Sequence, residues 1–222
     1  MATPAPRARR RSDALTRERI LVAAVAILDA KGSDAAAGLT SRALMARLST
    51  GSGAIYHHVA NMDELRAAAA DDVLRQALDD VASEGDPAEV LRAVAVGIFD
   101  SIGAHDWLGA QLSRDPAQPA VLRMWKAIGA QLHRLQISGM ASADAGSTLT
   151  SYILGSAVQQ AGRSPHGHSE AERATYLATL ADEMRATEPD TLVEEIADQL
   201  VDHDDRAQFI AGIDIILRGI TR

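Results

Sequence analysis

The sequence predicts an all-α protein in which a small N-terminal helical domain precedes a larger helical domain. Nearly half of the 222 residues (47%) are hydrophobic and many of these are alanine, so packed helices are favoured over sheets. In the clearest segments apolar residues recur three or four positions apart, as they do on one face of a helix. A chain of this length can bury the core of one or two domains.

The predicted N-terminal part begins with a basic arm and one helix. Residues 1–15 are rich in Pro and Arg and are predicted to be disordered. A helix is expected at about 16–31, and residues 32–38 are expected to form a loop. The side chains of this helix that we expect to face inward are Ile20, Ala24, Ile27 and Leu28.

Residues 39–65 predict two short helices joined by a tight turn, followed by the capped start of a third helix. Thr40 is a suitable N-cap for the first helix and Asn61 for the third. Residues 49–51 interrupt the pair, and Gly51 is available for a positive φ if the turn needs one.

The second helix of this pair has two contrasting faces. Ile55 and Val59 form an apolar face, whereas residues 52–54 are small and are followed by Tyr56 and His57. A short rod with such a bare surface fits the DNA major groove. The turn alone is equally compatible with an ordinary pair of core helices.

The rest of the chain is predicted to be helical with short interruptions. Asp86 and Pro87 provide a cap and a first helical residue after one break. A short helical turn is expected at 107–112 and a loop at 163–169. The longer helices are expected near 61–83, 87–105, 119–137, 142–163, 170–187, 190–202 and 205–219.

The stretch from about Arg17 to Leu74 resembles the DNA-binding domain of the TetR family of bacterial transcriptional regulators. The resemblance is carried by RERILVAAVAILDAKG and by SGAIYHHVANMDEL. Ser49 departs from the glycine that usually starts the turn, and Met62 replaces a lysine that often precedes the acidic pair. The second departure leaves the phosphate contact of that lysine without a counterpart.

The resemblance implies a regulator that binds a palindromic operator as a homodimer, most commonly as a repressor. It divides the chain into the arm at 1–15, a helix-turn-helix domain at 16–66 and an effector-binding and dimerisation domain at 67–222. The arm is either a solvated tail or a segment that grasps the DNA backbone or minor groove.

Position by position, the resemblance assigns DNA contacts to the first motif helix. Thr40 and Ser41 would donate to phosphates. Arg42 is the candidate base contact, because its guanidinium fits the two acceptors of guanine; the alternative is a surface charge or ion pair.

Contacts of a different kind are implied for the second motif helix. Ser52, Gly53 and Ala54 would bring this helix close to base edges and make van der Waals contacts. Tyr56 is expected to donate its hydroxyl to a phosphate, and His57 is expected at the backbone.

Two late helices are the candidates for dimerisation. The 142–163 helix is dense in Gly, Ala, Ser and Thr, and the 205–219 helix carries a broad apolar stripe. In the family that the chain resembles, the matching helices meet their twins in a four-helix interface. The alternative is that both lie in the core of the monomer.

The resemblance also implies a cavity in the larger domain for a small, mostly apolar effector of unknown identity. Aromatic and polar side chains are the candidates for its wall, although the tryptophans could equally be core residues. The residues considered are His105, Trp107, Arg114, Met124, Trp125 and His133.

The net charge of −8 is unevenly distributed. Residues 1–66 hold 10 Lys and Arg against 6 Asp and Glu, whereas residues 67–222 hold 12 against 24. The positive part therefore coincides with the helix-turn-helix, where DNA phosphates would meet it.

Other functional classes find little support in the sequence. Cysteine is absent, which excludes disulfides and thiolate ligands, and no phosphate-binding loop, HExxH or GxSxG motif occurs. We expect no cofactor, no resident metal, no membrane span and a cytoplasmic location; His166, His168 and Glu170 are the weak metal alternative. A small-molecule sensor with weak or lost DNA binding is the second interpretation, and an enzyme that uses the helical cavity is a remote third.

Overall fold

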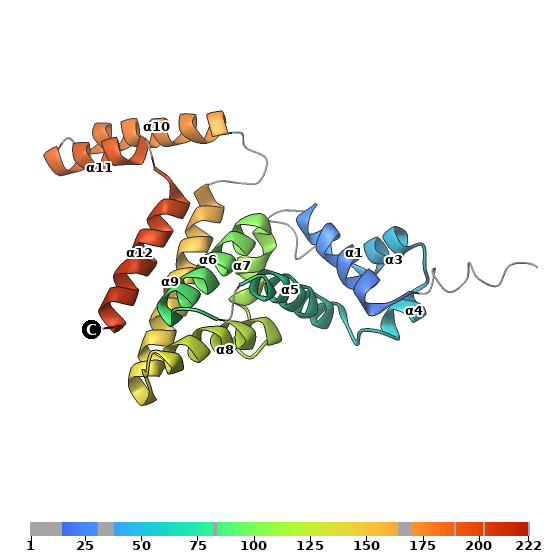
Figure 1. Cartoon of the computed structure of the whole chain (residues 1–222). Helices are drawn as coiled ribbons and strands as arrows, with labels where there is room; N and C mark the ends of the chain where they lie inside the picture. The colour runs from blue at the N-terminus through green and yellow to red at the C-terminus, as the bar shows by residue number, and fades with distance from the viewer. Residues whose placement is uncertain are drawn as a thin grey trace, which may run out of the picture.

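A computed structural model of the chain describes residues 15–30, 38–81, 84–163, 170–188, 190–201 and 203–221. These residues form eleven helices and no strand, which confirms the all-α prediction (Figure 1). The helices are α1 (Arg17–Asp29), α3 (Ser41–Leu48), α4 (Ser52–Tyr56), α5 (Met62–Asp79), α6 (Pro87–Ala104), α7 (Asp106–Leu112), α8 (Pro119–Arg134), α9 (Gly139–Arg163), α10 (Glu170–Thr187), α11 (Thr191–Val201) and α12 (Asp205–Ile220). The predicted arm and the predicted loops at 32–38 and 163–169 lie largely outside the described residues.

Side-chain caps start the N-terminal helices where the sequence indicated. The Thr40 hydroxyl accepts a hydrogen bond from the Ala43 amide at 3.1 Å, and Asn61 Oδ1 accepts one from the Glu64 amide at 2.7 Å. Glu64 Oε2 in turn accepts from the Ala60 amide at 2.6 Å. These bonds satisfy amides that have no partner within the first helical turn.

The turn between α3 and α4 takes its left-handed residue at Ser49 and not at Gly51. Ser49 has the left-handed backbone, with φ 50° and ψ 47°, whereas Gly51 has an ordinary extended φ of −90° and serves as the N-cap of α4. The left-handed residue directly follows α3 because its amide closes the last turn on the Met45 carbonyl. The turn therefore does not need a positive φ at Gly51, where glycine would have allowed one.

Several helix ends also differ from the prediction. α5 ends at Asp79 and α8 at Arg134, both earlier than expected, whereas α9 begins three residues early at Gly139. Left-handed backbone at Gln136 (φ 62°) and Gly139 (φ 61°) reverses the chain between α8 and α9. The predicted short turn at 107–112 is the seven-residue helix α7.

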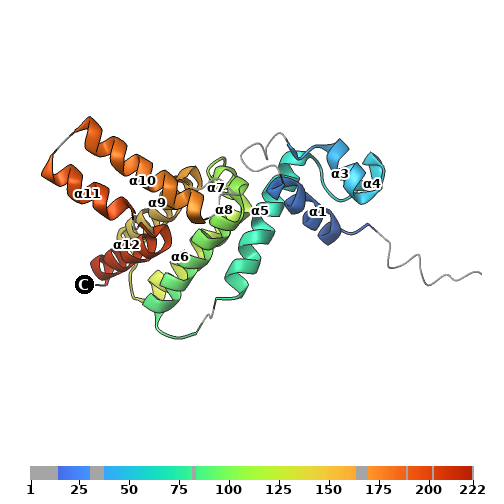
Figure 2. The ribbon, with the colours of Figure 1, turned by 90° about the horizontal axis from the view of Figure 1, so that it is seen from above.

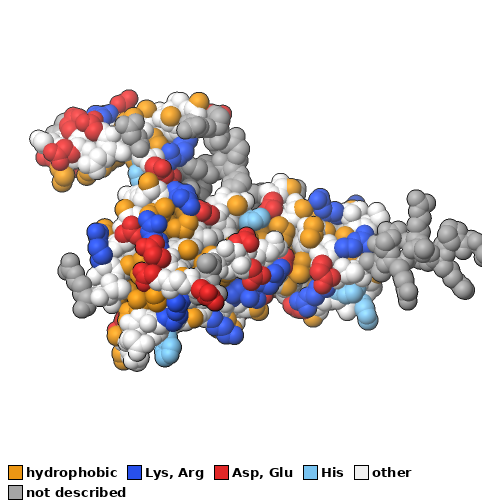
Figure 3. Space-filling view, viewed as in Figure 1, with side chains coloured by type: hydrophobic (Ala, Val, Ile, Leu, Met, Phe, Trp, Pro, Cys, Tyr) orange, Lys and Arg blue, Asp and Glu red, His pale blue; other side chains and the backbone are white. Residues whose placement is uncertain are grey.

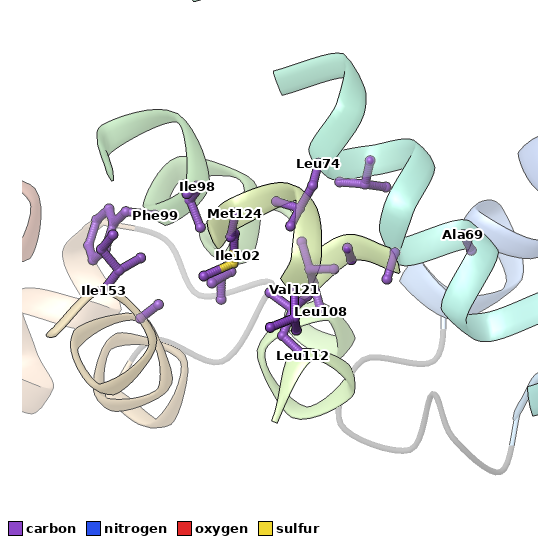
Figure 4. Close-up of a cluster of buried hydrophobic side chains, with 14 of the residues drawn as sticks. Ala69, Leu74, Ile98, Phe99, Ile102, Leu108, Leu112, Val121, Met124 and Ile153 are labelled. Carbon is purple, nitrogen blue, oxygen red and sulfur yellow. The ribbon is translucent and has the colours of Figure 1, made fainter. Parts of the chain in front are cut away.

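The larger helical body consists of α5 to α9 with α12, and a continuous apolar core lies between these helices (Figure 4). Phe99 of α6 stacks on Phe209 of α12 with ring centroids 4.1 Å apart. Tyr152 of α9 stacks on the same ring at 5.5 Å. These three helices are thereby held together by aromatic contacts.

The helices α1, α3 and α4 lie at one end of the molecule, and α5 connects them to the body (Figures 1 and 2). At the other end α10 and α11 form a hairpin that stands away from the body. α9 lies roughly perpendicular to the line from the helix-turn-helix to the larger body (Figure 1). The α8–α9 corner is at the N-terminal end of α9, and its C-terminal end leads toward the hairpin.

Candidate DNA-binding surface and ligand cavity

The helix-turn-helix is sealed on its inner side by large apolar residues. Leu44 of α3, Ile55 of α4 and Leu65 of α5 are fully buried, and Val59 is almost so. The predicted inward side chains of α1 are buried in the same core. This packing fixes the orientation of α4 and decides which of its side chains remain outside.

The outward side of α4, which we call the recognition helix, carries the predicted small residues. Ser52, Gly53 and Ala54 are all exposed, and no atom lies within 4 Å of the position that a Cβ would take at Gly53. Tyr56 is 46% exposed, and His57 is exposed beside it. Packing within the described residues does not explain why a surface of small side chains is followed by an exposed tyrosine.

The charged groups of α3 are available to a partner. Arg42 and Arg47 are exposed, and neither forms an ion pair within the described part of the chain. Arg66 of α5, by contrast, pairs with Asp63 at 2.7 Å and donates to the Leu39 carbonyl at 3.1 Å. Arg66 thus stabilises the domain, whereas Arg42 and Arg47 face solvent.

Thr40 and Ser41 lie at the start of the same helix. Thr40 is exposed and Ser41 is half-buried. The Thr40 oxygen is already the acceptor of the helix cap, so its hydroxyl proton can still be donated outward.

The six side chains considered for the effector cavity are not brought together. Met124 is fully buried in the core, and Arg114 is exposed. His105 and Trp107 instead lie at the junction with α1, where Trp107 Nε1 donates to Asp29 Oδ1 at 2.7 Å and His105 Nδ1 lies 2.8 Å from the same oxygen. Long-range packing decides these placements, which is why spacing in the sequence did not reveal them.

Trp125 and His133, the other two, line a hollow of about 430 Å³ at the α8–α9 corner. The indole of Trp125 lies against Gly146 so closely that a Cβ there would approach Cζ3 to 2.9 Å. The remaining lining residues, which sequence analysis did not single out, are Gly129, Leu132, Ile137, Ser138, Gly139, Ser142, Ala143 and Gly146. The helix break at 135–138, followed by small residues, is the sequence feature that could have indicated them.

Neither a metal centre nor a membrane span is found in the described residues. They contain no group of three or more His, Cys, Asp or Glu side chains placed to hold an ion. The alternative metal ligands His166 and His168 lie outside the described residues, as does the side chain of Glu170. Within the described helices, none is both long and apolar enough to cross a bilayer.

Comparison with solved structures gives the class to which this arrangement belongs. The transcriptional regulator SCO7222 of Streptomyces coelicolor, a TetR protein, is 39% identical with a TM-score of 0.81, over 93% of this chain and 98% of that one. Apo ActR from the same organism is 25% identical with a TM-score of 0.73, over 94% and 95% of the two chains. ActR in complex with actinorhodin is likewise 25% identical with a TM-score of 0.73, over 93% and 96%.

A scan of protein-family models and a search of curated proteins gave no match. The identity to SCO7222 over nearly the full length of both chains is sufficient to assign the family. The chain belongs to the TetR family of transcriptional regulators and is a DNA-binding regulator.

Proposed function

We propose that this chain is a ligand-responsive repressor that binds a palindromic operator as a homodimer and is released by a small, mostly apolar effector. In this proposal residues 16–66 bind DNA, and residues 67–222 bind the effector and the second subunit. The single observation that carries it is the recognition helix, which is sealed on its inner face and bare on its outer face.

The exposed groups of α3 suit the DNA contacts proposed for them. Arg42 reads a guanine through its two acceptors, since its guanidinium is exposed and has no acidic partner within the described residues. Thr40 and Ser41 donate to phosphates at the helix start, where the backbone amides also favour an anion.

The recognition helix contributes shape more than hydrogen bonds. Ser52, Gly53 and Ala54 let its backbone approach the base edges, because nothing longer than a hydroxymethyl group stands between. Tyr56 and His57 then reach the adjacent phosphates from the exposed side of the same helix.

The dimer interface that we propose consists of the outward faces of α9 and α12. Each helix also buries its opposite face in its own chain, at Ile153 for α9 and at Ile213 for α12. One face of each helix thus packs in the core of the monomer, and the other is available to the second subunit. Ile215 is 63% exposed on α12. The exposed face of α9 carries small residues, which allow another helix to approach closely. These residues are Ser147, Thr148, Ser151 and Gly155.

The hollow beside Trp125 is the effector site that we propose. Its volume of about 430 Å³ lies within the range of small-molecule sites, and its wall combines an indole and aliphatic groups with His133 and two serines. The solved complex of ActR with actinorhodin supports ligand binding by a protein of this fold. His105 and Trp107 then transmit the change to α1 instead of touching the effector.

DNA binding can be tested by gel shift against the DNA upstream of the chain's own gene. The proposal predicts a complex that contains two chains and resists competition by random DNA. Ile215→Arg, which places a charge in the proposed interface, should yield monomers by sedimentation and lose the complex. Leu122→Arg is the matched control, because Leu122 is also exposed but lies on α8. Equal shifts of specific and random DNA by the unaltered chain would contradict the proposal.

Effector binding can be tested in the same assay with a panel of aromatic small molecules. An effector should quench the fluorescence of Trp125 and lower the operator affinity by roughly 5- to 150-fold. Trp125→Phe removes the quenching, and Gly146→Ala displaces the indole and should weaken the response. Compounds that bind without changing operator affinity would show that the hollow is not regulatory.

A further inference from the structure

A second hollow, of about 370 Å³, lies where the helix-turn-helix end of the molecule meets the larger body. We call it the junction hollow. It is lined by Arg17 and Leu21 of α1, by the face of α5 that includes Glu64 and Asp71, and by Pro119, the first residue of α8. It shares no lining residue with the hollow at the α8–α9 corner, and none of its residues lies on α9 or α12. The junction hollow is therefore a separate place in which a ligand can bind.

At one end of the junction hollow the charged side chains are closely paired. Asp71 accepts two hydrogen bonds from Arg123 of α8, at 2.8 and 2.9 Å. Asp72 accepts one from Arg75 at 2.8 Å. Figure 3 shows both acidic and basic side chains on the surface of this part of the molecule. The two carboxylates already have arginine partners in their own chain, so this end does not need a charged ligand.

At the other end Arg17 and Glu64 form a looser pair. Glu64 Oε1 and Arg17 Nη2 are 3.9 Å apart, which is too far for a hydrogen bond. The other carboxylate oxygen, Oε2, accepts the Ala60 amide. Within the described residues neither Glu64 Oε1 nor the guanidinium of Arg17 forms a hydrogen bond. A hydrogen-bond acceptor and a donor therefore lie next to each other and are both available to a ligand.

The surface between these two ends is apolar. Glu64 and Asp71 are seven residues apart, which places them on the same face of α5 and roughly 10 Å apart along its axis. Between them α5 presents only the methyl groups of Ala67 and Ala68 to the junction hollow. The aliphatic side chains from α1 and from the start of α8 complete this part of the wall. The junction hollow thus combines one open polar pair with an adjoining hydrocarbon surface.

We propose that the junction hollow binds a small neutral molecule in which a cis amide, as in a lactam, is carried on an aliphatic body. In a cis amide the N–H and the C=O point to the same side. The N–H donates to Glu64 Oε1, and the carbonyl oxygen accepts from Arg17. The aliphatic body lies on Ala67 and Ala68.

A charged ligand fits this pair less well. A carboxylate that binds Arg17 lies close to Glu64, and an ammonium group that binds Glu64 lies close to Arg17, so each meets a like charge. The inference goes beyond the proposed function, because it uses neither the dimer interface nor the hollow beside Trp125.

Caprolactam is the probe that tests the inference, because it joins a cis amide to an aliphatic ring. Its binding to the full chain is measured by saturation-transfer NMR titration at fixed ionic strength. N-methylcaprolactam is the matched control compound, since it lacks only the N–H donor. It should bind roughly tenfold more weakly or less, as should cyclohexanecarboxylate and cyclohexylammonium. Failure of caprolactam to bind, or equal binding of N-methylcaprolactam, would overturn the inference.

Two variants locate the bound probe. Arg17→Met removes the guanidinium but keeps an aliphatic side chain, and it should weaken caprolactam binding about tenfold or more. Ala68→Leu fills the junction hollow and should weaken binding without a change of charge. Arg19→Met is the matched control, because Arg19 is also exposed on α1 but does not line the junction hollow.

Thermal unfolding of each variant confirms that it is folded before its affinity is compared. Loss of binding in Arg17→Met and Ala68→Leu, with normal binding in Arg19→Met, supports the inference. If caprolactam binds both lining variants as tightly as the unaltered chain, it binds elsewhere and the inference is wrong. Neither result changes the expectations for the hollow beside Trp125, which is tested by its own variants.

Discussion

Asp29 of α1 accepts a hydrogen bond from the indole of Trp107 in α7, with 2.7 Å between Oδ1 and Nε1. His105 lies 2.8 Å from the same oxygen, and Trp107 is buried. Asp29 is the last residue of α1, so this contact joins the helix-turn-helix end of the molecule to the larger body. A shift of α6 or α7 therefore acts directly on α1.

Replacing either partner should weaken this junction. Asp29→Ala and Trp107→Phe are each expected to lower the free energy of unfolding by about 1–3 kcal/mol, because a hydrogen bond to a charged acceptor is lost. In a double-mutant cycle by urea unfolding, the two losses should be less than additive by about 0.5 kcal/mol or more. Additive losses would show that the contact between Asp29 and Trp107 does not contribute to stability.

Arg42→Ala should reduce discrimination between operator and random DNA. The expected loss is about 1–3 kcal/mol on the operator relative to random sequence, measured by fluorescence anisotropy at fixed salt. Arg47→Ala is the control, since Arg47 is also exposed on the same helix but lies in its last turn. If Arg42→Ala weakens both DNAs equally, Arg42 contacts phosphate and does not read a base.

Ser49→Gly should stabilise the protein. Ser49 has a φ of 50°, a backbone conformation that costs a non-glycine residue roughly 1 kcal/mol, and glycine adopts it freely. We expect a gain of about 0.5–1 kcal/mol in thermal or urea unfolding, reduced by the greater entropy of glycine in the unfolded chain. Ser49→Ala keeps the strain and should give no gain; a gain of the same size there would assign the effect to the lost hydroxyl.

The ion pair between Arg92 of α6 and Asp214 of α12 should make stability depend on acid pH. Its nitrogen and oxygen are 2.7 Å apart, and the hydrogen bond from Arg92 lowers the pKa of Asp214 below its ordinary value of 3.8. Because the pKa of Asp214 is lower in the folded than in the unfolded chain, the ion pair stabilises the fold fully at pH values above 3.8. This stabilisation is lost as the pH falls through the pKa of Asp214 in the folded chain.

Asp214→Asn tests this dependence. Both side chains are more than a third exposed, so the expected loss at about pH 7 is only about 0.2–1 kcal/mol. The difference between the variant and the unaltered chain should shrink toward about pH 3 in urea unfolding. A difference that is independent of pH would assign the loss to packing.

The helix-turn-helix was predictable because its determinants are local. Thr40 and Asn61 cap their helices through side-chain bonds to residues three positions away, and Ile55 and Val59 follow a four-residue apolar spacing. Gly51 was available for a positive φ, but the left-handed residue is Ser49, because the end of α3, and not residue type, decides where the chain reverses.

The effector cavity was less predictable because distant parts of the chain form it. Trp107 and Trp125 look alike in the sequence, yet one is hydrogen-bonded to α1, 78 residues away, and the other lies on Gly146. The α10–α11 hairpin was predicted as two helices, but its separation from the body follows from packing that periodicity does not encode.

Selection of bound duplexes from a random pool tests the central claim most directly, because it asks whether two recognition helices read one DNA. The account predicts enrichment of an inverted repeat whose half-sites lie one helical turn apart, roughly 34–36 Å, or a multiple of it. Ile215→Arg should abolish this enrichment. Recovery of unrelated sequences, or of single half-sites without symmetry, would contradict it.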